Sequence, residues 1–575
     1  MPEPITHQRF DPAQGELSYY TYDTLTRLLH ELVAAYPQLA TLESIGKSYE
    51  GRALWLVTLT NQATGPALEK PAYWIDGNTH AGEVTGSTVV LYTIWSYLSQ
   101  YGQDARVTRA LDRHAIYLLP RISVDGAEKY ITTPYRLRSS TRRYPYEEER
   151  DGLTPADLDG NGLIRQMRFK DPNGAFVKSA KDPRIMRPRP IDADGDGEYY
   201  TVVTEGLIHN YDGVSIPLAP PREGLDINRN YPYFWETEGI ELGPGPYPFS
   251  EPETRAEAEF WRTHLNINGV VTYHTESGVL LRPYGTHPDE HFPTADLDVF
   301  KIIGARGTEI TGYPCISTYH DFRYSPKAVM HGALDDYAYE YQGWFAFTPE
   351  LWDLPKLAGI GPRDWIGWIR WHPEDDDLKL MRWSDEEEKG RAFLNWTPFD
   401  HPQLGPVEIG GWDTKFHQEN LPVKYLPEIC QKMSAWTLSN ISLNPYLSTP
   451  MLTVSAQGEN TYHIEVVLQN NGFLPTYTSQ KALERKIVRP IEVELSLPAD
   501  VILVSGKQKQ EIGHLEGRSN KISVLWDAPS PTDNRARLEW VVSGPDAAQL
   551  ELTVRAQRAG TLRRSITLKN NPASL

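Results

Sequence analysis

The segment AYWIDGNTHAGEVTG at residues 72–86 constrains the fold more than any other part of the chain. Its apolar start, residues 72–75, predicts a buried strand, and a glycine-containing loop separates this strand from a helix expected over about 84–99. The loop carries His80 and Glu83, three residues apart. An imidazole and a carboxylate at this spacing can bind one Zn²⁺, which also needs a third protein ligand and, for catalysis, an open position. By itself the spacing is unspecific.

A third ligand is available at His274, which follows the β-branched run of VVTYH. Further strands and helices are predicted by a helical pattern at 22–36, a hairpin pattern at 45–60, a strand from residue 115 that ends in a turn at Asp125-Gly126, and an amphipathic helix at about 425–440. This alternation predicts an α/β fold with a mixed, mainly parallel sheet flanked by helices. Ligands of such sheets bind beyond the carboxyl ends of the strands, where His80 and His274 fall.

The C-terminal part of the chain has a different pattern. Apolar and polar residues alternate in TYHIEVVLQNN, PIEVELSL, NKISVLW, ARLEWVVS and QLELTVRA. Some seven or eight short strands in about 130 residues predict a β-sandwich. We therefore expect two domains: residues 1–442, with the metal-ligand candidates and an irregular insertion at about 139–224, and residues 443–575, an immunoglobulin-like accessory domain.

The insertion contains two acidic turns, DLDGNG and DADGDG. Alternate oxygen-bearing side chains in a glycine-rich turn can wrap Ca²⁺. The candidate ligands are Asp157, Asp159 and Asn161, or Asp192, Asp194 and Asp196. Neither turn has the acidic twelfth residue of an EF-hand, because Arg168 and Val203 stand there. Turns closed by hydrogen bonds of the Asp and Asn side chains, without a metal, account for the pattern equally well.

Composition narrows the classes of function. The net charge of −19 argues against a nucleic-acid partner, because phosphate binding requires a basic surface. Two cysteines, Cys315 and Cys430, are too few for a disulfide framework, although the two could pair with each other. The N-terminal residues lack the features of a signal peptide, and no apolar run approaches the roughly 18 residues of a membrane span. A soluble, cytoplasmic protein is expected, of unknown oligomeric state.

Several motifs occur in an order typical of one enzyme family. They are EGR at 50–52, H-x-x-E at 80–83, RLRSSTRR at 136–143, NRN at 228–230, His274 followed by RPYG, and FTPELWD around Glu350. Over residues 15 to 440 the chain resembles the carboxypeptidase A/B family of zinc metallocarboxypeptidases, in a bacterial type with an insertion and a C-terminal β-sandwich. The resemblance implies that His80, Glu83 and His274 bind Zn²⁺ and that Glu350 is the general base. The apolar neighbours of Glu350 suit a carboxylate with a raised pKa.

The resemblance also implies residues that bind substrate. Arg229 and Asn228 match the pair that holds the terminal carboxylate, for which the planar guanidinium is well suited. Arg138 is the candidate for stabilising the oxyanion, with Arg136 as the alternative. Tyr324 is the candidate for the tyrosine that caps the substrate, with Tyr337 and Tyr319 as alternatives. In the same motif, Arg142 and Arg143 are expected to be surface cations.

The chain departs from the digestive members of the family at two positions. Gly82 stands where they carry an arginine, and Glu276 stands where they carry a tyrosine. Asp335 or Asp336 could place a carboxylate near the side-chain pocket and favour basic C-terminal residues, or could have a structural role. Eight of the 16 tryptophans lie between residues 352 and 436, where packing under long loops is expected and a substrate groove is the alternative.

The predicted function is hydrolysis of the C-terminal peptide bond of peptides by a zinc-dependent carboxypeptidase. Two alternatives remain at this stage. One is a zinc amide hydrolase that acts on unusual peptides, such as cell-wall fragments with D- or acidic residues. The other is a catalytically silent binding protein that retains the fold.

Overall fold

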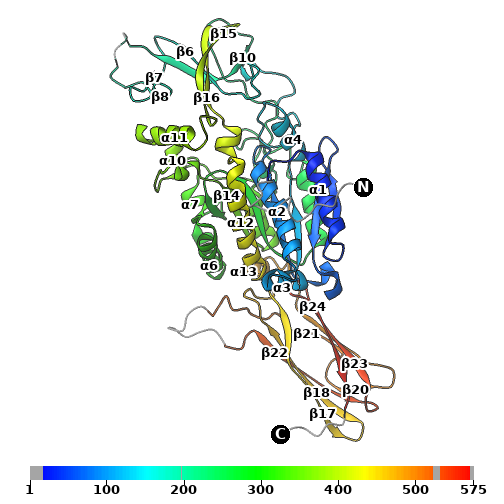
Figure 1. Ribbon diagram of the computed structural model, residues 1–575. Coiled ribbons are helices and arrows are strands. Elements are labelled where there is room, and N and C mark those ends of the chain that lie inside the picture. The colour runs from blue at the N-terminus through cyan, green and yellow to red at the C-terminus, as the bar shows by residue number, and fades with distance from the viewer. Residues whose placement is uncertain (1–16, 194, 196, 522–530, 570–575) are drawn as a thin grey trace.

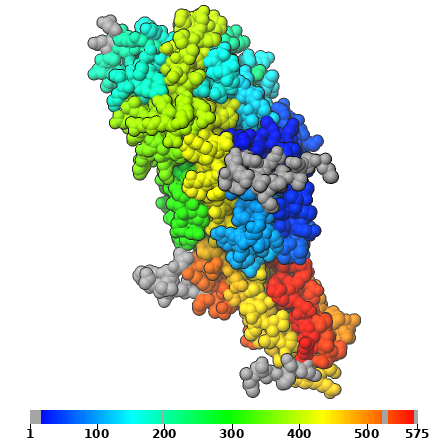
Figure 2. All heavy atoms as spheres, viewed as in Figure 1, coloured from blue at the N-terminus to red at the C-terminus, as the bar shows by residue number. Residues whose placement is uncertain are grey.

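The computed structural model describes residues 17–193, 195, 197–521 and 531–569. Figure 1 shows three parts in a row: the strands of the insertion at the top, the α/β part in the middle, and the C-terminal strands at the bottom. Figure 2 shows that the insertion and the yellow-green segment that contains residues 393–412 form one continuous surface at the top of the molecule. Within the described residues, no helix has both the length and the apolar character needed to cross a membrane.

The central element is an eight-stranded mixed sheet. Its strand order is β1 (Ala40–Lys47), β2 (Ala53–Leu59), β4 (Ala115–Leu119), β3 (Ala72–Gly77), β11 (Ile267–Thr275), β14 (Phe345–Leu351), β12 (Val279–Arg282) and β13 (Cys315–Ser317). The adjacent pairs β4–β3, β3–β11, β11–β14 and β12–β13 are parallel, and the others are antiparallel. The predicted mixed sheet, including the hairpin β1–β2, is confirmed.

Helices cover both faces of this sheet. Trp74 of β3 packs edge-on against Trp261 of α5, whereas Tyr273 of β11 shares a hydrogen bond with Thr437 of α12 at 2.6 Å. Trp74 pairs with Val270, three residues before Tyr273, so the two side chains point to opposite faces. The helices are α1 (Tyr22–Ala35), α2 (Val84–Gln100), α3 (Ala105–Arg113), α4 (Val124–Thr132), α5 (Pro252–Thr263), α6 (Thr294–Thr311), α7 (Thr318–Asp321), α8 (Leu334–Gln342), α9 (Leu354–Leu357), α10 (Trp365–Arg370), α11 (Glu374–Glu386), α12 (Leu426–Ile441) and α13 (Gln480–Glu484).

The turn predicted at Asp125-Gly126 is wrong, because both residues lie in the first turn of α4. Gly126 is required for packing: a Cβ atom there would lie 1.8 Å from the carbonyl oxygen of Ser139. The Asp125 carboxylate accepts hydrogen bonds from Ser48 and Arg52, so the EGR motif joins the hairpin to this helix.

The insertion is more regular than predicted. It contains β5 (Gly152–Pro155), β6 (Gln166–Lys170), β7 (Phe176–Lys178), β8 (Met186–Pro188), β9 (Tyr200–Thr204) and β10 (Gly206–His209). Four of these strands join β15 (Phe393–His401) and β16 (Gly405–Trp412) in a sheet of order β15-β16-β6-β9-β7-β8. Met167, Ile208 and Ile409 belong to its small buried core. Arg168 of β6 pairs with Glu408 of β16, 240 residues further along the chain, and short strands paired at that separation leave little local signal.

The C-terminal part contains eight described strands in two antiparallel sheets, as predicted. They are β17 (Leu447–Gly458), β18 (Thr461–Asn470), β22 (Arg535–Ser543) and β20 (Ile502–Ser505) in one, and β21 (Lys509–Glu511), β19 (Glu492–Ser496), β23 (Gln549–Ala556) and β24 (Gly560–Thr567) in the other. One hydrophobic cluster joins both sheets, as in a sandwich. Most of the predicted strand NKISVLW lies outside the described residues.

The sandwich contacts the end of the main sheet that is remote from His274. The buried Arg558 donates to the carbonyl oxygens of Ile267, at the start of β11, and Gln342, at the end of α8. Ser479 Oγ donates to Gly343 O at 2.7 Å. Both cysteines are free thiols, so the pair that the sequence left open does not form a disulfide.

Candidate active site

Three neighbouring parallel strands end at one edge of the main sheet and supply the site. Gly77, the last residue of β3, pairs with Tyr273 of β11, and His274 pairs with Glu350 of β14. The loop after β3 starts at Asn78, whose φ of 62° is one that asparagine tolerates. Its side-chain amide donates to the carbonyl oxygens of His80 and Ala81 at 2.6 and 3.2 Å, which folds the loop toward His274.

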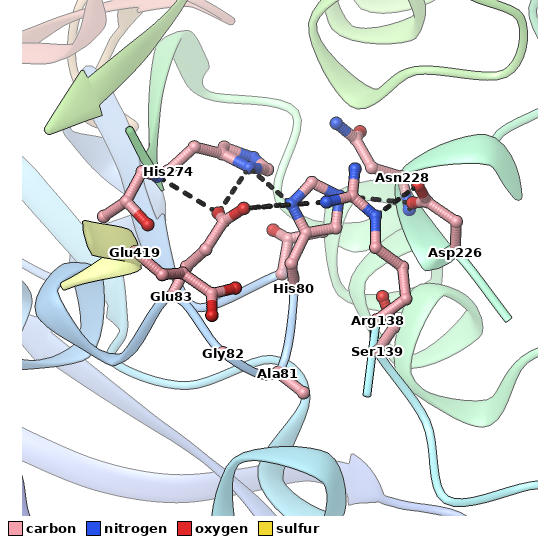
Figure 3. Close-up of polar contacts among 12 residues, drawn as sticks. His80, Ala81, Gly82, Glu83, Arg138, Ser139, Asp226, Asn228, His274 and Glu419 are labelled. Atoms are coloured by element: carbon pink, nitrogen blue, oxygen red, sulfur yellow. Dashed lines mark hydrogen bonds and ion pairs between the residues drawn. The ribbon is translucent and has the colours of Figure 1, made fainter. Parts of the chain in front are cut away.

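The structure brings His80, Glu83 and His274 together (Figure 3). The two Nδ1 atoms of His80 and His274 are 3.1 Å apart. Glu83 Oε1 lies 2.7 Å from His80 Nδ1, and Oε2 lies 2.9 Å from His274 Nδ1. All three side chains are buried. Two imidazole nitrogens and one carboxylate, each aimed at one point, fit the donor set of a Zn²⁺ site that keeps a position open.

The electrostatics of the cluster favour an ionised carboxylate. Burial alone would raise the pKa of Glu83, but the adjacent imidazoles of His80 and His274 hold that pKa well below its usual value. A ligand to a cation must be deprotonated, so Glu83 is already in the form that binds.

Asp226, which was not among the residues predicted from the sequence, lies behind the cluster. Its Oδ1 is 3.2 Å from Nε2 of His80, and its Oδ2 accepts from Nε of Arg138 at 2.7 Å. Asp226 therefore orients both a metal-ligand candidate and the guanidinium beside it, the arrangement expected of a second layer around a metal. Its position two residues before the NRN motif was the available signal.

Glu350 lies in the same cavity of about 190 Å³ as the His80, Glu83 and His274 cluster. Burial raises the pKa of Glu350 well above its usual value, and the nearby charge of Glu83 adds to this shift. A carboxyl group with a raised pKa can both accept and return a proton near neutral pH.

Of the candidate arginines, Arg138 and Arg229 lie in the cavity and the others lie outside it. Arg138 lines the cavity, with Nη1 3.8 Å from Glu83 Oε1, and Arg229 lines it with Asn228. Arg229 donates to Asn228 O at 2.9 Å and lies 3.5 Å from Glu241, and Asn228 Oδ1 accepts from the backbone of Leu334. These contacts hold the guanidinium and the amide in place.

Arg136 points elsewhere, because it pairs with Glu419 at 3.1 Å and is not among the lining residues of this cavity. Arg142 is not a free surface cation as expected: it makes two hydrogen bonds, of 2.6 and 2.9 Å, to the fully buried carboxylate of Glu251. Arg143 is exposed and donates to Glu147 O at 3.1 Å.

Of the three tyrosine candidates, only Tyr324 lines the cavity, and it is half exposed. Tyr337 is buried among the rings of Tyr231 and Trp261. Tyr319 lies next to the guanidinium of Arg323, outside the cavity lining. A half-exposed ring that lines the cavity is placed to close over a bound ligand, whereas the other two tyrosines are packed in the core or lie outside the lining.

Gly82 and Glu276, the two positions at which the chain departs from the digestive enzymes, both lie next to Glu419. A Cβ atom at Gly82 would lie 2.3 Å from Glu419 Oε1, so the side chain of Glu419 occupies the space that a larger residue at 82 would need. Burial raises the pKa of Glu276 to about 8, and the charge of Glu419 adds to the shift while Arg136 opposes it. Glu419 comes from a short π-helical turn, Lys415–Glu419, that no motif predicts.

The two aspartates at the start of α8 have different surroundings. Asp335 lines the cavity. Asp336 does not, because its buried carboxylate accepts from Gly285 N at 2.9 Å and from Thr286 Oγ1 at 2.7 Å, a structural role.

The acidic turn at 157–162 is closed by its own hydrogen bonds. Asp157 Oδ1 accepts from the backbone of Gly160 and Asn161, and Asn161 donates its side-chain amide to Asp159. Asp157, Asp159 and the buried Glu205 have ligand atoms within 4.8 Å of one another. In the second turn, Asp194 and Asp196 lie outside the described residues, and Asp192 is exposed.

A helix-covered mixed sheet thus carries a buried His-Glu-His cluster that fits one metal ion at the carboxyl ends of its central strands, with Glu350 in the same cavity. The family model for zinc carboxypeptidases matches residues 25–360, and a model for a domain of unknown function matches residues 447–567. The chain belongs to the zinc carboxypeptidase family. The resemblance predicted from the motifs is thereby confirmed.

Individual relatives are distant. The chain is 24% identical to carboxypeptidase A6 of Homo sapiens over 360 residues, 60% of this chain and 62% of that protein. It is 24% identical to carboxypeptidase B of Astacus astacus over 363 residues, 61% of this chain and 91% of that protein. The crystal structure of thrombin activatable fibrinolysis inhibitor matches with a TM-score of 0.42 and 17% identity, covering 76% of each chain. The chain thus spans less than two thirds of the length of the human relative.

Proposed function

We propose that the protein is a zinc-dependent metallocarboxypeptidase that hydrolyses the C-terminal peptide bond of a peptide. The observation that carries this proposal is the convergence of His80, Glu83 and His274 within one cavity that also contains Glu350 and Arg229. In this proposal His80, Glu83 and His274 hold Zn²⁺. A zinc ion in such a set acts as a Lewis acid that activates water and polarises the scissile carbonyl.

Glu350 is the proposed general base. It accepts a proton from the attacking water as the new carbon–oxygen bond forms, and returns a proton to the leaving amine as the carbon–nitrogen bond breaks. The products are a shortened peptide with a new carboxylate and one free amino acid. The raised pKa of Glu350 supports both proton transfers.

The cations of the cavity have proposed roles in binding and in stabilising charge. Arg229 and Asn228 bind the free carboxylate of the substrate, and the contact of Arg229 with Glu241 fixes its orientation. Arg138 stabilises the negative charge that develops on the carbonyl oxygen, since Asp226 holds its guanidinium in place before substrate arrives. Tyr324 closes the mouth of the cavity and excludes water.

We further propose that the chain divides near residue 443 into a catalytic domain and an accessory domain. The helix α12 ends at Ile441, β17 begins at Leu447, and the sandwich has a hydrophobic core of its own. Limited proteolysis is expected to cut the chain near residue 443 and to leave two resistant fragments, one for each domain.

The test of the proposed function uses the full chain loaded with zinc and a panel of peptides with free, amidated and D-configured C-termini. Mass spectrometry should detect the release of single amino acids from free L-termini, no release from amidated peptides, and loss of activity with a chelator that zinc restores. Cleavage at internal bonds, or equal cleavage of free and amidated peptides, would contradict the proposal. Cleavage of D-configured peptides alone would instead indicate the amide hydrolase of unusual peptides.

A further inference from the structure

We propose that a tryptophan-lined cavity next to the catalytic cavity binds a bulky aromatic or apolar group of the substrate, on the acyl side of the scissile bond. The inference rests on the proposed carboxypeptidase function and specifies its substrate class. The cavity has a volume of about 290 Å³. Four of the eight tryptophans in the 352–436 segment line it: Trp352, Trp365, Trp368 and Trp412. Trp383 and Trp436 are packed in the core, as predicted from the sequence for the whole group.

The short helix α10 is a common wall of both cavities. Ile366 and Ile369 line the catalytic cavity, whereas Trp365, Trp368 and Ile369 line the tryptophan cavity. Glu276 and Ser277, just beyond His274, also line both. Arg370 donates to the carbonyl oxygen of Tyr324, so the end of the same helix contacts the proposed capping tyrosine. The two cavities are therefore adjacent and share lining residues, and a ligand that fills one can extend into the other.

The direction of the substrate follows from the positions of the anchoring groups. Figure 3 shows Asn228 and Asp226 on one side of the His80–Glu83–His274 cluster and Glu419 on the opposite side. The proposed carboxylate anchors, Asn228 and Arg229, thus lie on the first side. Glu276 lies on the second, since its electrostatic neighbours are Glu419, Arg136 and Gln418. A peptide whose C-terminal residue binds Arg229 and whose scissile carbonyl lies at the cluster must continue toward Glu276 and the tryptophan cavity.

The chemistry of the lining favours an uncharged, aromatic or apolar occupant. Four of its five titratable groups are paired within the protein: Arg363 with Asp353 at 2.6 Å, and His372 with Asp377 at 2.9 Å. The fifth, Glu276, lies at the border with the catalytic cavity and has Gln418 as a hydrogen-bond partner. The indole N–H groups of Trp365 and Trp368 donate to Ser277 O and Asp376 Oδ2, both at 3.0 Å. With the charges and these donors satisfied, the ring faces and aliphatic carbons remain to contact a ligand, and aromatic faces bind aromatic or apolar groups best.

The test compares acyl groups on one C-terminal dipeptide, chosen as the best substrate from the panel above. The zinc-loaded full chain is assayed with the N-acetyl, N-benzyloxycarbonyl and N-acetyl-tryptophanyl forms. Burial of one aromatic group is expected to raise kcat/KM on the order of tenfold over the acetyl form, mainly through KM. Trp365→Ala and Trp368→Ala should reduce this ratio to about threefold or less, each variant being referred to its own acetyl rate. Trp371→Ala is the matched control, because Trp371 follows α10 directly but is 73% exposed and lies outside the cavity lining.

The inference would be overturned if the natural sequence cleaved the aromatic and acetyl forms with nearly equal kcat/KM. It would also be overturned if both Trp365→Ala and Trp368→Ala kept the full preference for the aromatic form. An equal loss in Trp371→Ala would overturn it as well, since such a loss would indicate a general effect of altering the segment. Calorimetric binding of the same peptides to Glu350→Gln gives a second readout without turnover. If no peptide is cleaved, the proposed function fails, but the binding measurement still tests the role of the cavity. Equal dissociation constants for the acetyl and benzyloxycarbonyl forms would refute that role.

Discussion

The substitution Asp226→Asn isolates the contribution of the residue behind the metal cluster. Asp226 is not among the residues that line the cavity with His80, Glu83 and His274. It accepts a hydrogen bond from Arg138 at 2.7 Å and lies 3.2 Å from His80 Nε2. Asparagine has almost the same size and retains one oxygen. The exchange therefore removes a negative charge and leaves the packing intact, so any loss of zinc affinity reports on orientation and charge rather than on a cavity.

The size of the effect can be estimated in two ways. Loss of a carboxylate that orients a histidine ligand typically lowers metal affinity 10- to 100-fold, or about 1.4 to 2.7 kcal/mol. Independently, a hydrogen bond to a charged partner contributes about 1.5 to 3 kcal/mol. The two ranges overlap, and we therefore expect zinc to bind Asp226→Asn about 30-fold more weakly. Turnover at saturating zinc should also fall, because Arg138 loses the partner that fixes its guanidinium.

Zinc affinity is measured by competition with a chromogenic chelator. Asp296→Asn is the matched control: Asp296 is equally buried and accepts from Tyr339 Oη and from the backbone of Gln480 and Lys481, but lies toward the sandwich. The control should bind zinc within about twofold of the natural sequence. Unchanged affinity in Asp226→Asn, or an equal decrease in both variants, would refute the assignment of Asp226 as the residue that orients His80.

Three further predictions concern Glu350 and Arg229 in the cavity and the buried His114 at the end of α3. Glu350→Gln should keep one zinc per chain but lower kcat by about 10²- to 10⁴-fold, the range for loss of a general base; full activity in that variant would remove the assignment. Arg229→Ala should raise KM for peptides with a free terminus at least tenfold, and Arg255→Ala, a surface arginine that contacts only backbone oxygens, should not. Burial lowers the pKa of His114 to about 4. Because the folded pKa lies below the unfolded value of about 6.5, the free energy of unfolding should fall by up to about 3 kcal/mol as pH drops from 6.5 to 4. In zinc-free protein, unfolding of His114→Gln in denaturant should show a shallower dependence on pH over that interval, and an unchanged slope would contradict this origin.

Much of the fold was predictable because its signals are local. The stripe Leu25, Leu28, Leu29 and Leu32 is the buried face of α1, and the helix after the metal loop begins at Val84 as expected. The convergence of His80 with His274 was also predictable, because two parallel strands in one sheet bring the loops at their carboxyl ends together whatever lies between them in the chain. The error at Asp125-Gly126 has a local cause as well: Asp-Gly favours a turn, but close packing against Ser139 requires glycine inside a helix.

Residues that act through another residue were harder to predict. Asp226, Glu241 and Glu419 each hold a site residue or fill the space beside one, and none of them lies in an α-helix or a named strand whose periodic pattern would indicate it. Their roles depend on which arginine or glycine lies opposite, and that pairing is a tertiary property. The absence of a side chain at Gly82 was visible in the sequence; the carboxylate of Glu419 that occupies its place, more than 300 residues further on, was not.

The tryptophan-rich segment 352–436 forms a cavity that, like the roles of these acidic residues, could not be predicted from the sequence. Aromatic density predicts burial, because each indole removes a large apolar area from water, and Trp352, Trp383 and Trp436 are indeed almost fully buried. Composition does not reveal that α10 separates two cavities. Trp365 and Trp368 are three residues apart on a six-residue helix whose intervening Ile366 faces the catalytic side. Specificity on the acyl side of the substrate would then depend on the placement of one short helix, which lies beyond the residues that the zinc carboxypeptidase model matches.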